Sequence, residues 1–354
     1  MTKENLKGMP LRELEPKLMA LGHPAFRARQ LFRWVYQRGQ NEFENMTDLS
    51  KVFRKELSEK FCLASLSVDR AEHSADGTIK YLVMLEDGQK VETVFIPAED
   101  RNTVCISTQV GCKMGCKFCA TGYQKFTRNL ESWEIVEQCF LPFPRPVTNV
   151  VMMGMGEPLD NYDELIKALE ILQDPLGVKI GKRHITVSTV GLSPKIEDLA
   201  KKGLANIAIS LHGTTQEQRS AIMPVSRKHP LEELIVLCQR LKFKGRRRIT
   251  FEYVLIKGVN DSNEDALRLA ALVKNIRCKI NLLAYNENPF CSYERPSEKR
   301  VLSFQSILLE KNLTATYRKS RGADISAACG QLRTASLNRV SQNAARSLAF
   351  SPEP

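Results

Sequence analysis

The sequence predicts an α/β fold, with a parallel sheet that is barrel-like or doubly wound, because three patterns follow one another along its 354 residues. At the N-terminus, Leu11, Leu14, Leu18 and Leu21 recur at helical spacing. A β-hairpin pattern follows, and from about residue 103 strand-like runs alternate with helix-like runs. Such alternation is typical of parallel α/β domains, in which ligands bind at the C-terminal ends of the strands.

The N-terminal segment contains a predicted helix that interleaves arginine with aromatic residues, with Arg27, Arg29, Arg33 and Arg38 around Trp34. These residues are suited to gripping an RNA backbone and stacking a base. An equally good interpretation is a solvated basic face beside a buried aromatic stripe. The sequence leaves these two interpretations open.

A β-hairpin is predicted between the helical segment and the alternating region. The apolar runs 79–85 and 89–96 flank Glu86-Asp87-Gly88, and Asp-Gly is a strong hairpin signal. The expected organisation therefore has four parts. These are an N-terminal helical RNA-binding accessory domain at 1–75, a β-hairpin extension at 76–102, an α/β barrel at 103–335 and a basic C-terminal tail at 336–354.

The alternating region predicts seven strands and six helices. The strand-like runs are 103–108, 148–154, 184–189, 206–213, 249–258, 279–285 and 313–319. The helix-like runs are 130–140, 162–172, 193–202, 231–243, 263–276 and 297–311. Beyond this topology no sequence repeat recurs, which argues against a solenoid.

Charge and composition narrow the functional class. Lys and Arg number 52 against 40 acidic residues, so the formal charge is +12. This excess favours an anionic partner, nucleic acid above all, although a generally basic enzyme would look similar. No apolar run is long enough to span a bilayer and the N-terminus has no apolar signal segment, so we expect a cytoplasmic protein without membrane attachment. Ten cysteines in such a chain indicate buried thiols, metal ligands or redox groups rather than disulfides.

The most informative motif is a cysteine cluster. Cys112, Cys116 and Cys119 form C-x3-C-x2-C directly after the first predicted strand of the α/β region. Three thiolates in one short loop can bind three irons of an iron–sulfur cube and leave the fourth iron open to a ligand. A structural zinc site would need a fourth Cys or His at finger-like spacing, and none follows nearby. Structural zinc or buried thiols are the alternatives.

The motifs around this cluster resemble those of the RlmN/Cfr family of radical S-adenosylmethionine (SAM) RNA adenine methyltransferases. They follow the family order over nearly the whole chain and comprise residues 91–97, 105–112, 154–158, 188–189, 210–212, 258–262, Asn286 and 324–332. The resemblance implies a partial (β/α) barrel of radical SAM type with an N-terminal helical accessory domain and a β-hairpin extension.

The resemblance also implies two cofactors. Cys112, Cys116 and Cys119 would hold a [4Fe-4S] cluster whose free iron chelates SAM, and two SAM molecules would be used per turnover. The residues that match SAM contacts of the family are Gly156, Glu157, Ser188, Ser210, Leu211, His212 and Asn286. Taken alone, each of these residues would more often be an ordinary loop or core residue.

Two further cysteines and one carboxylate match the catalytic residues of the family. By resemblance, Cys329 is methylated by the first SAM, and a radical from the second SAM takes a hydrogen atom from that methyl group. The resulting carbon radical adds to adenine, whose C2 is too electron-poor for polar methyl transfer. Cys105 then removes the ring proton and forms a transient disulfide with Cys329. Glu92 matches a proton acceptor, and its alternative is an exposed strand carboxylate.

The resemblance implies 23S rRNA and tRNA as substrates, an electron donor such as flavodoxin, no membrane partner and a monomer. Gly-Glu-Pro-Leu at 156–159 favours methylation of C2, whereas the Cfr-type relatives methylate C8. Lys125 occupies a position where the family usually has Gly, so the turn there could differ. The alternative from another class is a non-catalytic RNA-binding metal protein, which would need neither Cys105 nor Cys329.

Overall fold

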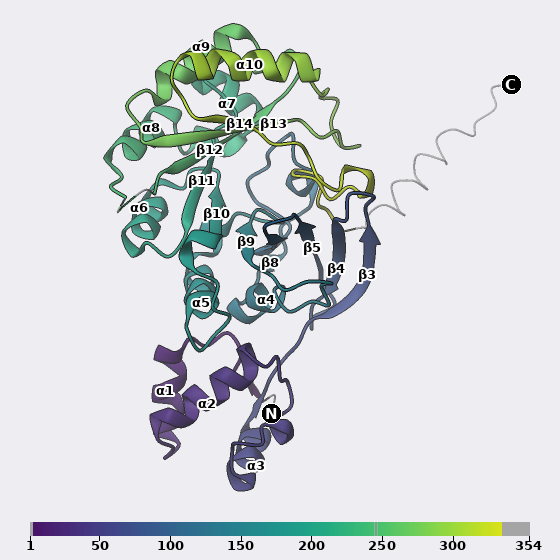
Figure 1. Ribbon diagram of the computed structural model, residues 1–354, viewed down its shortest axis with the longest axis vertical. Helices are drawn as coiled ribbons and strands as arrows, with labels where there is room; N and C mark the ends of the chain where they lie inside the picture. Colours follow the sequence, from purple (N-terminus) through teal and green to yellow (C-terminus); the bar gives the residue numbers. More distant parts are fainter. Residues whose placement is uncertain (1–2, 244, 246, 335–354) are drawn as a thin grey trace, which may run out of the picture.

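The computed structural model describes residues 3–243, 245 and 247–334. A helical N-terminal part lies below a large sheet that is flanked by helices (Figure 1). The predicted tail at 336–354 lies outside the described residues. Within the described part of the chain, no helix has the length and apolar character needed to cross a membrane.

Seven parallel strands form one side of a ten-stranded sheet and confirm the seven predicted strands. In spatial order they are β6 (Asn102–Cys105), β9 (Asn149–Met152), β10 (Ile185–Thr189), β11 (Asn206–Ser210), β12 (Ile249–Leu255), β13 (Cys278–Ala284) and β14 (Ala315–Tyr317). The sheet ends at β14 without pairing back to β6, which makes it a partial barrel.

All six predicted helices are present beside these strands. They are α4 (Ser132–Glu137), α5 (Tyr162–Gln173), α6 (Ser193–Lys202), α8 (Leu231–Arg240), α9 (Asn263–Val273) and α10 (Glu298–Glu310). Local sequence sets their ends: Ser262 and Asp265 form a capping box at the start of α9, and Gly203 ends α6 in the left-handed conformation. The short helix α7 (Gln216–Ile222) was not predicted.

Three antiparallel strands extend the sheet beyond β6. They are β3 (Ser67–His73), β4 (Ile79–Met84) and β5 (Lys90–Pro97), and β5 pairs directly with β6. The pairing of β4 with β5 confirms the predicted hairpin, and Gly88 supplies the positive φ (78°) that its turn needs. The edge strand β3 was not predicted, because its side chains are mostly exposed and lack the alternation of a half-buried strand.

The N-terminal part consists of α1 (Leu11–Ala20), α2 (Ala25–Tyr36) and α3 (Lys51–Lys60), with the paired short strands β1 (Glu4–Asn5) and β2 (Phe61–Cys62). Trp34 is buried, its indole donates a hydrogen bond to Asp48, and the Arg38 guanidinium lies 3.9 Å from its ring centroid. Trp34 therefore cannot stack a base, and the interpretation as a buried aromatic stripe holds for it.

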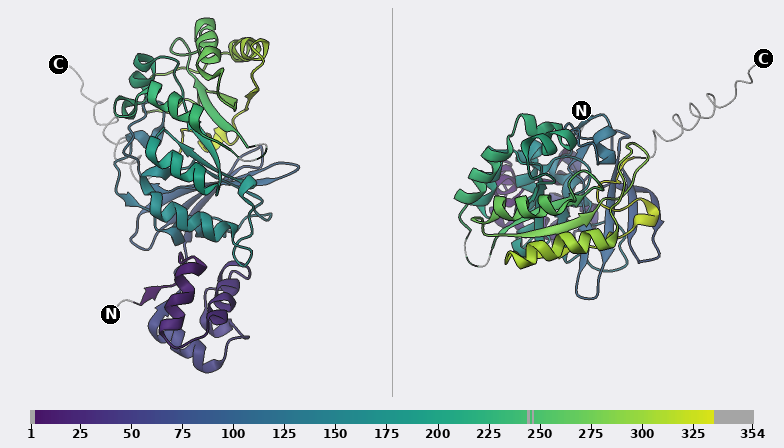
Figure 2. Two further views of the ribbon diagram at one scale, coloured as in Figure 1. Left: turned by 90° about the vertical axis from the view of Figure 1, so that its left-hand side faces the viewer. Right: turned by 90° about the horizontal axis from the view of Figure 1, so that it is seen from above.

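The N-terminal part docks on the outer side of α4 and α5 (Figure 2). The buried Lys7 ammonium lies 2.8 Å from the Glu137 carboxylate, and the Ser132 hydroxyl donates to the Gly8 carbonyl at 2.9 Å. Because a buried charge without its partner is costly, the Lys7–Glu137 pair makes this docking specific.

The remaining elements are short and shape the loops. They are β7 (Gln109–Val110), β8 (Arg128–Asn129) and the 3-10 helices η1 (Phe43–Asn45), η2 (Ala120–Tyr123), η3 (Pro158–Asn161), η4 (Lys182–His184), η5 (Pro224–Arg227) and η6 (Ala323–Ile325). Several of them lie in the loops after the parallel strands, where ligands of such folds bind.

Candidate active site

Three cysteines lie in one loop between β7 and η2. The Cys119 N–H donates to the Cys116 carbonyl at 3.2 Å, which turns the chain between these two residues. Gly122 lies against the same carbonyl, and a Cβ there would come within 2.5 Å of the oxygen, so a larger residue does not fit without movement. Cys112, Cys116 and Cys119 therefore come from one compact loop.

These thiols fit an iron–sulfur cube better than a single metal ion. Among the residues that the structure describes, no three His, Cys, Asp or Glu side chains converge closely enough to bind one ion. A [4Fe-4S] cube binds each cysteine on a different iron and so keeps the sulfurs apart. Burial raises the pKa of Cys112 to about 12 and also raises the pKa of Cys116 and Cys119. Three thiolates here therefore need a positively charged group, and iron supplies one.

The cysteine loop lines a cavity together with the C-terminal ends of β9 to β13. The cavity has an empty volume of about 1030 Å³ including its open mouth. Six of the seven predicted cofactor residues line it, namely Gly156, Glu157, Ser188, Ser210, His212 and Asn286.

Leu211 is the exception: its side chain does not line the cavity, and its contact with the cofactor stays a prediction. Successive side chains of a strand point to opposite faces, so Ser210 faces the cavity and Leu211 faces the core, where it is fully buried. The Leu211 carbonyl accepts a hydrogen bond from Arg219 at 3.2 Å.

Gly156 and Glu157 join the ends of two strands. Gly156 has a φ of 98° and lies so close to Gln109 that a Cβ would come within 2.5 Å of that side chain. The Glu157 carboxylate accepts the N–H of Leu159 at 3.1 Å and of Val190 at 2.9 Å. Burial raises the pKa of Glu157 to about 7, although these hydrogen bonds oppose the shift. Glu157 therefore anchors the loop after β9 to the end of β10.

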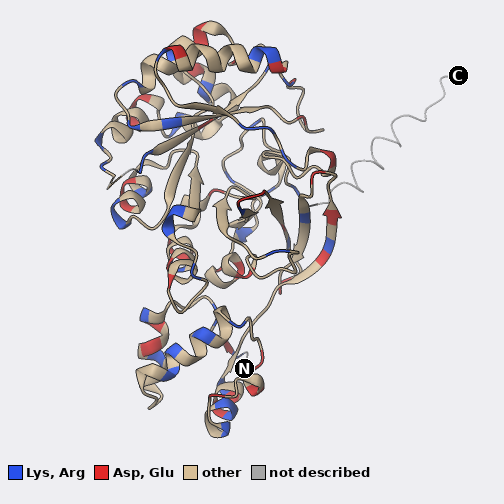
Figure 3. Ribbon diagram, viewed as in Figure 1, with Lys and Arg blue, Asp and Glu red and all other residues tan. Residues whose placement is uncertain are grey.

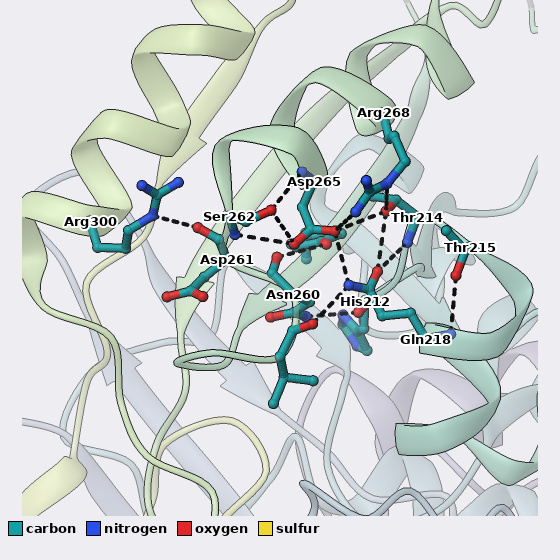
Figure 4. Close-up of polar contacts among 12 residues, drawn as sticks. His212, Thr214, Thr215, Gln218, Asn260, Asp261, Ser262, Asp265, Arg268 and Arg300 are labelled. Carbon is teal, nitrogen blue, oxygen red and sulfur yellow. Dashed lines mark hydrogen bonds and ion pairs between the residues drawn. The ribbon is translucent and has the colours of Figure 1, made fainter.

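His212 is held as a neutral donor at the end of β11 (Figure 4). Its Nδ1 accepts the Val254 N–H at 3.1 Å, which leaves the proton on Nε2, and burial lowers its pKa to about 3. Its φ of 55° is strained for a residue other than glycine. Asn260 holds this geometry, because its amide donates to the His212 carbonyl at 2.8 Å and to the Val254 carbonyl at 2.7 Å. This network gives the predicted 258–262 motif a positioning role.

The Cys329 loop packs directly on the cysteine loop. The Ala120 N–H donates to the Gly330 carbonyl at 2.7 Å, and the Thr121 hydroxyl donates to the Leu332 carbonyl at 2.6 Å. The Asn286 amide donates to the Cys329 carbonyl at 3.2 Å. These contacts bring Cys329, more than 200 residues away along the chain, beside the three cluster cysteines.

Cys105 and Cys329 are both free thiols and lie close enough to influence each other. Cys329 lines the cavity and is exposed to it, whereas Cys105 is buried at the end of β6. Burial, and then the nearby charge of Cys329, raise the pKa of Cys105 to about 12, and burial also raises the pKa of Cys329; Arg318 opposes both shifts. Cys329 thus lies at the cavity, and Cys105 lies outside its lining but near enough to affect Cys329 electrostatically.

Glu92 lies on β5, beside β6, and does not line the cavity itself. It is 2% exposed, so the alternative of an exposed strand carboxylate is wrong. Its carboxylate accepts the Arg333 N–H at 2.7 Å and lies 3.4 Å from the Lys80 ammonium. Burial raises the pKa of Glu92 to about 7, with Lys80 opposing the shift. The carboxyl can therefore exchange a proton near neutral pH.

The β3–β4 turn holds the segment that precedes Cys329. The Gly322 N–H donates to Asp76 at 3.1 Å, and the Lys80 ammonium donates to the Ile325 carbonyl at 2.7 Å. Because Lys80 also contacts Glu92, the extension of the sheet positions the Cys329 loop and the buried carboxylate together.

Two buried charged residues near the site were not predicted. Arg219 is fully buried on α7 and donates to the carbonyls of Val190 (2.5 Å), Leu211 (3.2 Å) and Ser210 (3.4 Å), which fixes the ends of β10 and β11. Glu252 lines the cavity, and burial raises its pKa. Neither lies in a motif, and only the tertiary contacts show their positions.

Lys125 does not disturb the loop. Its side chain is exposed and its backbone does not have a positive φ, so a residue other than glycine is tolerated there. Its carbonyl lies against Gly111, where a Cβ would come within 2.2 Å. The tight turn therefore depends on Gly111 rather than on glycine at 125.

Comparisons with known proteins agree with this geometry. Residues 106–270 match the radical SAM superfamily, and residues 4–63 match the ribosomal RNA large subunit methyltransferase N-terminal domain. Two relatives, from Geotalea uraniireducens (strain Rf4) and Geobacter sulfurreducens, are each named dual-specificity RNA methyltransferase RlmN. They are 49% and 50% identical to this chain, cover 94% of it, and are themselves covered over 97% and 92% of their length.

A solved structure shares the whole architecture. A radical SAM methyltransferase from Sphaerobacter thermophilus superposes with a TM-score of 0.88 at 44% identity. The match covers 93% of this chain and 99% of that protein. The chain therefore belongs to the RlmN family of radical SAM RNA methyltransferases.

Proposed function

We propose that this protein methylates C2 of adenine in 23S rRNA and in tRNA next to the anticodon, with Cys329 as the carrier of the carbon atom. The observation that carries the proposal is the packing of the Cys329 loop on the cysteine loop, through the 2.7 Å hydrogen bond from the Ala120 N–H to the Gly330 carbonyl. A non-catalytic RNA-binding protein has no need of a second cysteine at this position. Family membership supports RNA as the substrate, and the names of the relatives agree with C2 rather than C8.

Cys112, Cys116 and Cys119 would hold a [4Fe-4S] cluster, and the cavity residues at the strand ends would hold SAM. When bound, these groups supply a methyl group and a carbon-centred radical. His212 faces the cavity with a proton on Nε2, so it can donate a hydrogen bond to the bound cofactor. Glu157, Asn260 and Arg219 keep the strand ends in place through their backbone hydrogen bonds.

The chain's own thiols would complete the transfer. Cys329 accepts the methyl group at its sulfur and later presents that carbon to the adenine. The adduct formed by the carbon radical would give up its unpaired electron, for which the cluster is the available acceptor, and Cys105 would take the proton from C2. The Cys105 sulfur would then bond to that of Cys329, and the electron pair of the broken carbon–sulfur bond would stay on the carbon that leaves with the base. The released carbon takes up a proton and becomes the methyl group. An external reductant restores both thiols.

Glu92 would receive the proton that Cys105 takes from C2. It is buried beside the strand that bears Cys105, and its pKa of about 7 allows it to be a carboxylate at neutral pH. The Arg333 N–H and Lys80 hold the carboxylate in place. Glu92 is thus suited to accept a proton and pass it on.

Three further features belong to this proposal. A one-electron donor such as flavodoxin would reduce the cluster, because radical formation consumes an electron. The resemblance to the family implies that the protein works as a monomer. The cytoplasm is the place where ribosomal and transfer RNA are available together.

Nucleoside mass spectrometry tests the function directly. The anaerobically reconstituted protein is incubated with SAM, a reductant and unmodified RNA, and the digest is compared with standards. We expect 2-methyladenosine from the wild type and from Cys238→Ala, which alters a buried cysteine of the core, and none from Cys329→Ala. Cys105→Ala should accumulate a covalent protein–RNA adduct. Formation of 8-methyladenosine would show that the enzyme methylates C8 instead. If Cys329→Ala kept the wild-type product and rate, Cys329 could not be the carrier of the carbon atom.

A further inference from the structure

A second, strongly basic groove lies at the opposite end of the partial barrel from the candidate active site. It has an empty volume of about 1950 Å³, open solvent included, and its wall is formed where β10 to β13 begin. Eight basic residues and no acidic residue line it, namely Lys182, Arg183, Lys201, Lys202, Lys242, Arg247, Arg248 and Lys279. We call it the basic groove.

Most of this charge has no acidic partner within the described part of the chain. Lys201 pairs with Glu197 at 2.8 Å and Lys202 approaches Asp198 at 4.0 Å, and no other lining residue forms an ion pair there. Burial lowers the pKa of Lys279, the charge of Glu252 opposes this shift, and the nearby Arg248 lowers the pKa further. Mutual repulsion of this kind is relieved by a bound polyanion.

The basic groove continues toward the N-terminal part. Lys182 and Arg183 are exposed and follow the loop after α5. That loop touches α2, because the Gln37 amide donates to the Pro175 carbonyl at 2.9 Å. Arg33 on α2 is exposed and forms no ion pair with the described residues. Figure 3 shows basic segments (blue) on α2, near the start of β10 and on α6, on the same side of the molecule.

The distance to the reacting thiols limits what this surface can do. Strand β12 has 7 residues between the two ends of the barrel, which corresponds to roughly 20 Å at about 3.3 Å per residue. A phosphate in the basic groove therefore cannot belong to the target nucleotide, so we expect it to come from a distant segment of the same RNA.

We propose that the basic groove and the exposed face of α2 bind the phosphate backbone of the substrate RNA at a distance from the target adenine. This inference rests on the proposed function and extends it from the target loop to the rest of the RNA. The groove would contribute affinity and salt dependence without changing the chemical step, because it contacts neither the cysteines nor the cofactor cavity.

The test compares two triple variants with the same change in charge. The groove variant carries Lys182→Gln, Arg183→Gln and Lys202→Gln. The control carries Arg145→Gln, Lys274→Gln and Lys311→Gln, which are exposed and lie outside the groove. Arg247 is left intact because it donates to the carbonyls of Gly203 and Ala205 and so supports the end of α6. Each protein is assayed for methylation of a full-length tRNA transcript and of its isolated anticodon stem-loop.

We expect the groove variant to raise KM for the full-length transcript by about 10-fold or more at physiological salt, with kcat at saturating RNA unchanged. The slope of log affinity against log salt should fall by about 2 to 3, since each lost phosphate contact removes roughly 0.7 to 0.9. The stem-loop should show the wild-type KM. SAM cleavage without RNA should be unchanged, which verifies the fold and the cluster.

Equal KM values and salt slopes in the groove and control variants would overturn the inference. The groove would then be a candidate site for an acidic protein or for free phosphate. An equal rise for the transcript and the stem-loop would also overturn it, because the contact would then be local. If the wild type itself methylated neither RNA, the proposed function would fail, and that outcome is distinct from a failure of the groove.

Discussion

The two ends of the partial barrel are built from the same strands but contain opposite chemistry. The C-terminal ends carry four thiols, small polar residues and buried carboxylates around one cavity. The N-terminal ends carry eight basic side chains that are partly open to solvent. One sheet can therefore separate a reaction cavity from a strongly basic surface, because the two ends of the same strands do not have to share a role.

The largest effect should come from removing a cluster ligand, which sharpens this comparison. Cys116→Ala should reduce methylation to background and lower the bound iron, because the other two cysteines cannot complete the three-point attachment. RNA affinity should remain within about twofold of wild type, since the phosphate contacts lie elsewhere. Iron analysis, methylation and filter binding measure the three quantities. A loss of RNA affinity as large as that of the groove variant would break the comparison.

The second prediction compares one arginine from each end. Arg219→Leu should lower the free energy of unfolding by about 3 kcal/mol or more, since several buried carbonyls lose their donor and each costs roughly 1–3 kcal/mol. Arg247→Leu should cost about 1–2 kcal/mol, because its two carbonyls lie in a more open region. Denaturant unfolding measures both, with the exposed Arg227→Leu as a control. A larger loss for Arg247 would contradict the assigned rigidity of the C-terminal ends.

The third prediction concerns pH. The native pKa of Glu92 is raised from 4.5 to about 7, so the folded protein binds this proton more tightly than the unfolded chain. The contribution of Glu92 to stability is therefore fully present below about pH 4.5 and is lost as the pH rises through 7, by about 3 kcal/mol. Glu92→Gln should lack that part of the fall, whereas the exposed Glu99→Gln should keep it. Chemical unfolding between pH 4.5 and 8 checks the sign, and parallel curves for all three proteins would exclude the shift.

The smallest effect should come from the glycines of the cysteine loop. Gly122→Ala places a Cβ 2.5 Å from the Cys116 carbonyl and should cost about 1–3 kcal/mol and reduce bound iron. In Gly115→Ala the new Cβ has no neighbour within 4 Å, and only the φ of 66° is unfavourable. We expect this variant to lose about 1 kcal/mol of unfolding free energy and to keep its iron. Thermal unfolding and iron content separate the two. Equal iron loss in both variants would mean that backbone conformation, and not the close approach, shapes the loop.

Much of the fold could be predicted because its signals are local. All seven parallel strands and the β4–β5 hairpin follow from apolar runs and the Asp-Gly turn. The edge strand β3 and the helix α7 could not, since exposed or very short elements depend on their neighbours. Leu211 shows the limit at the site: its motif was visible, but strand alternation directs its side chain into the core.

The chemical groups of this protein could be identified from the sequence alone: three cysteines in one loop, Cys105 before and Cys329 after them in the chain, a basic net charge and the succession of strands and helices. These properties depend on residue type and on spacing over a few positions. The contacts between these groups come from the tertiary structure. It places Gly330, the residue after Cys329, against Ala120, buries Glu92 beside the Arg333 N–H, and collects eight basic residues from separate segments into one groove. Such contacts join residues far apart in the chain, and packing around the shared sheet brings them together.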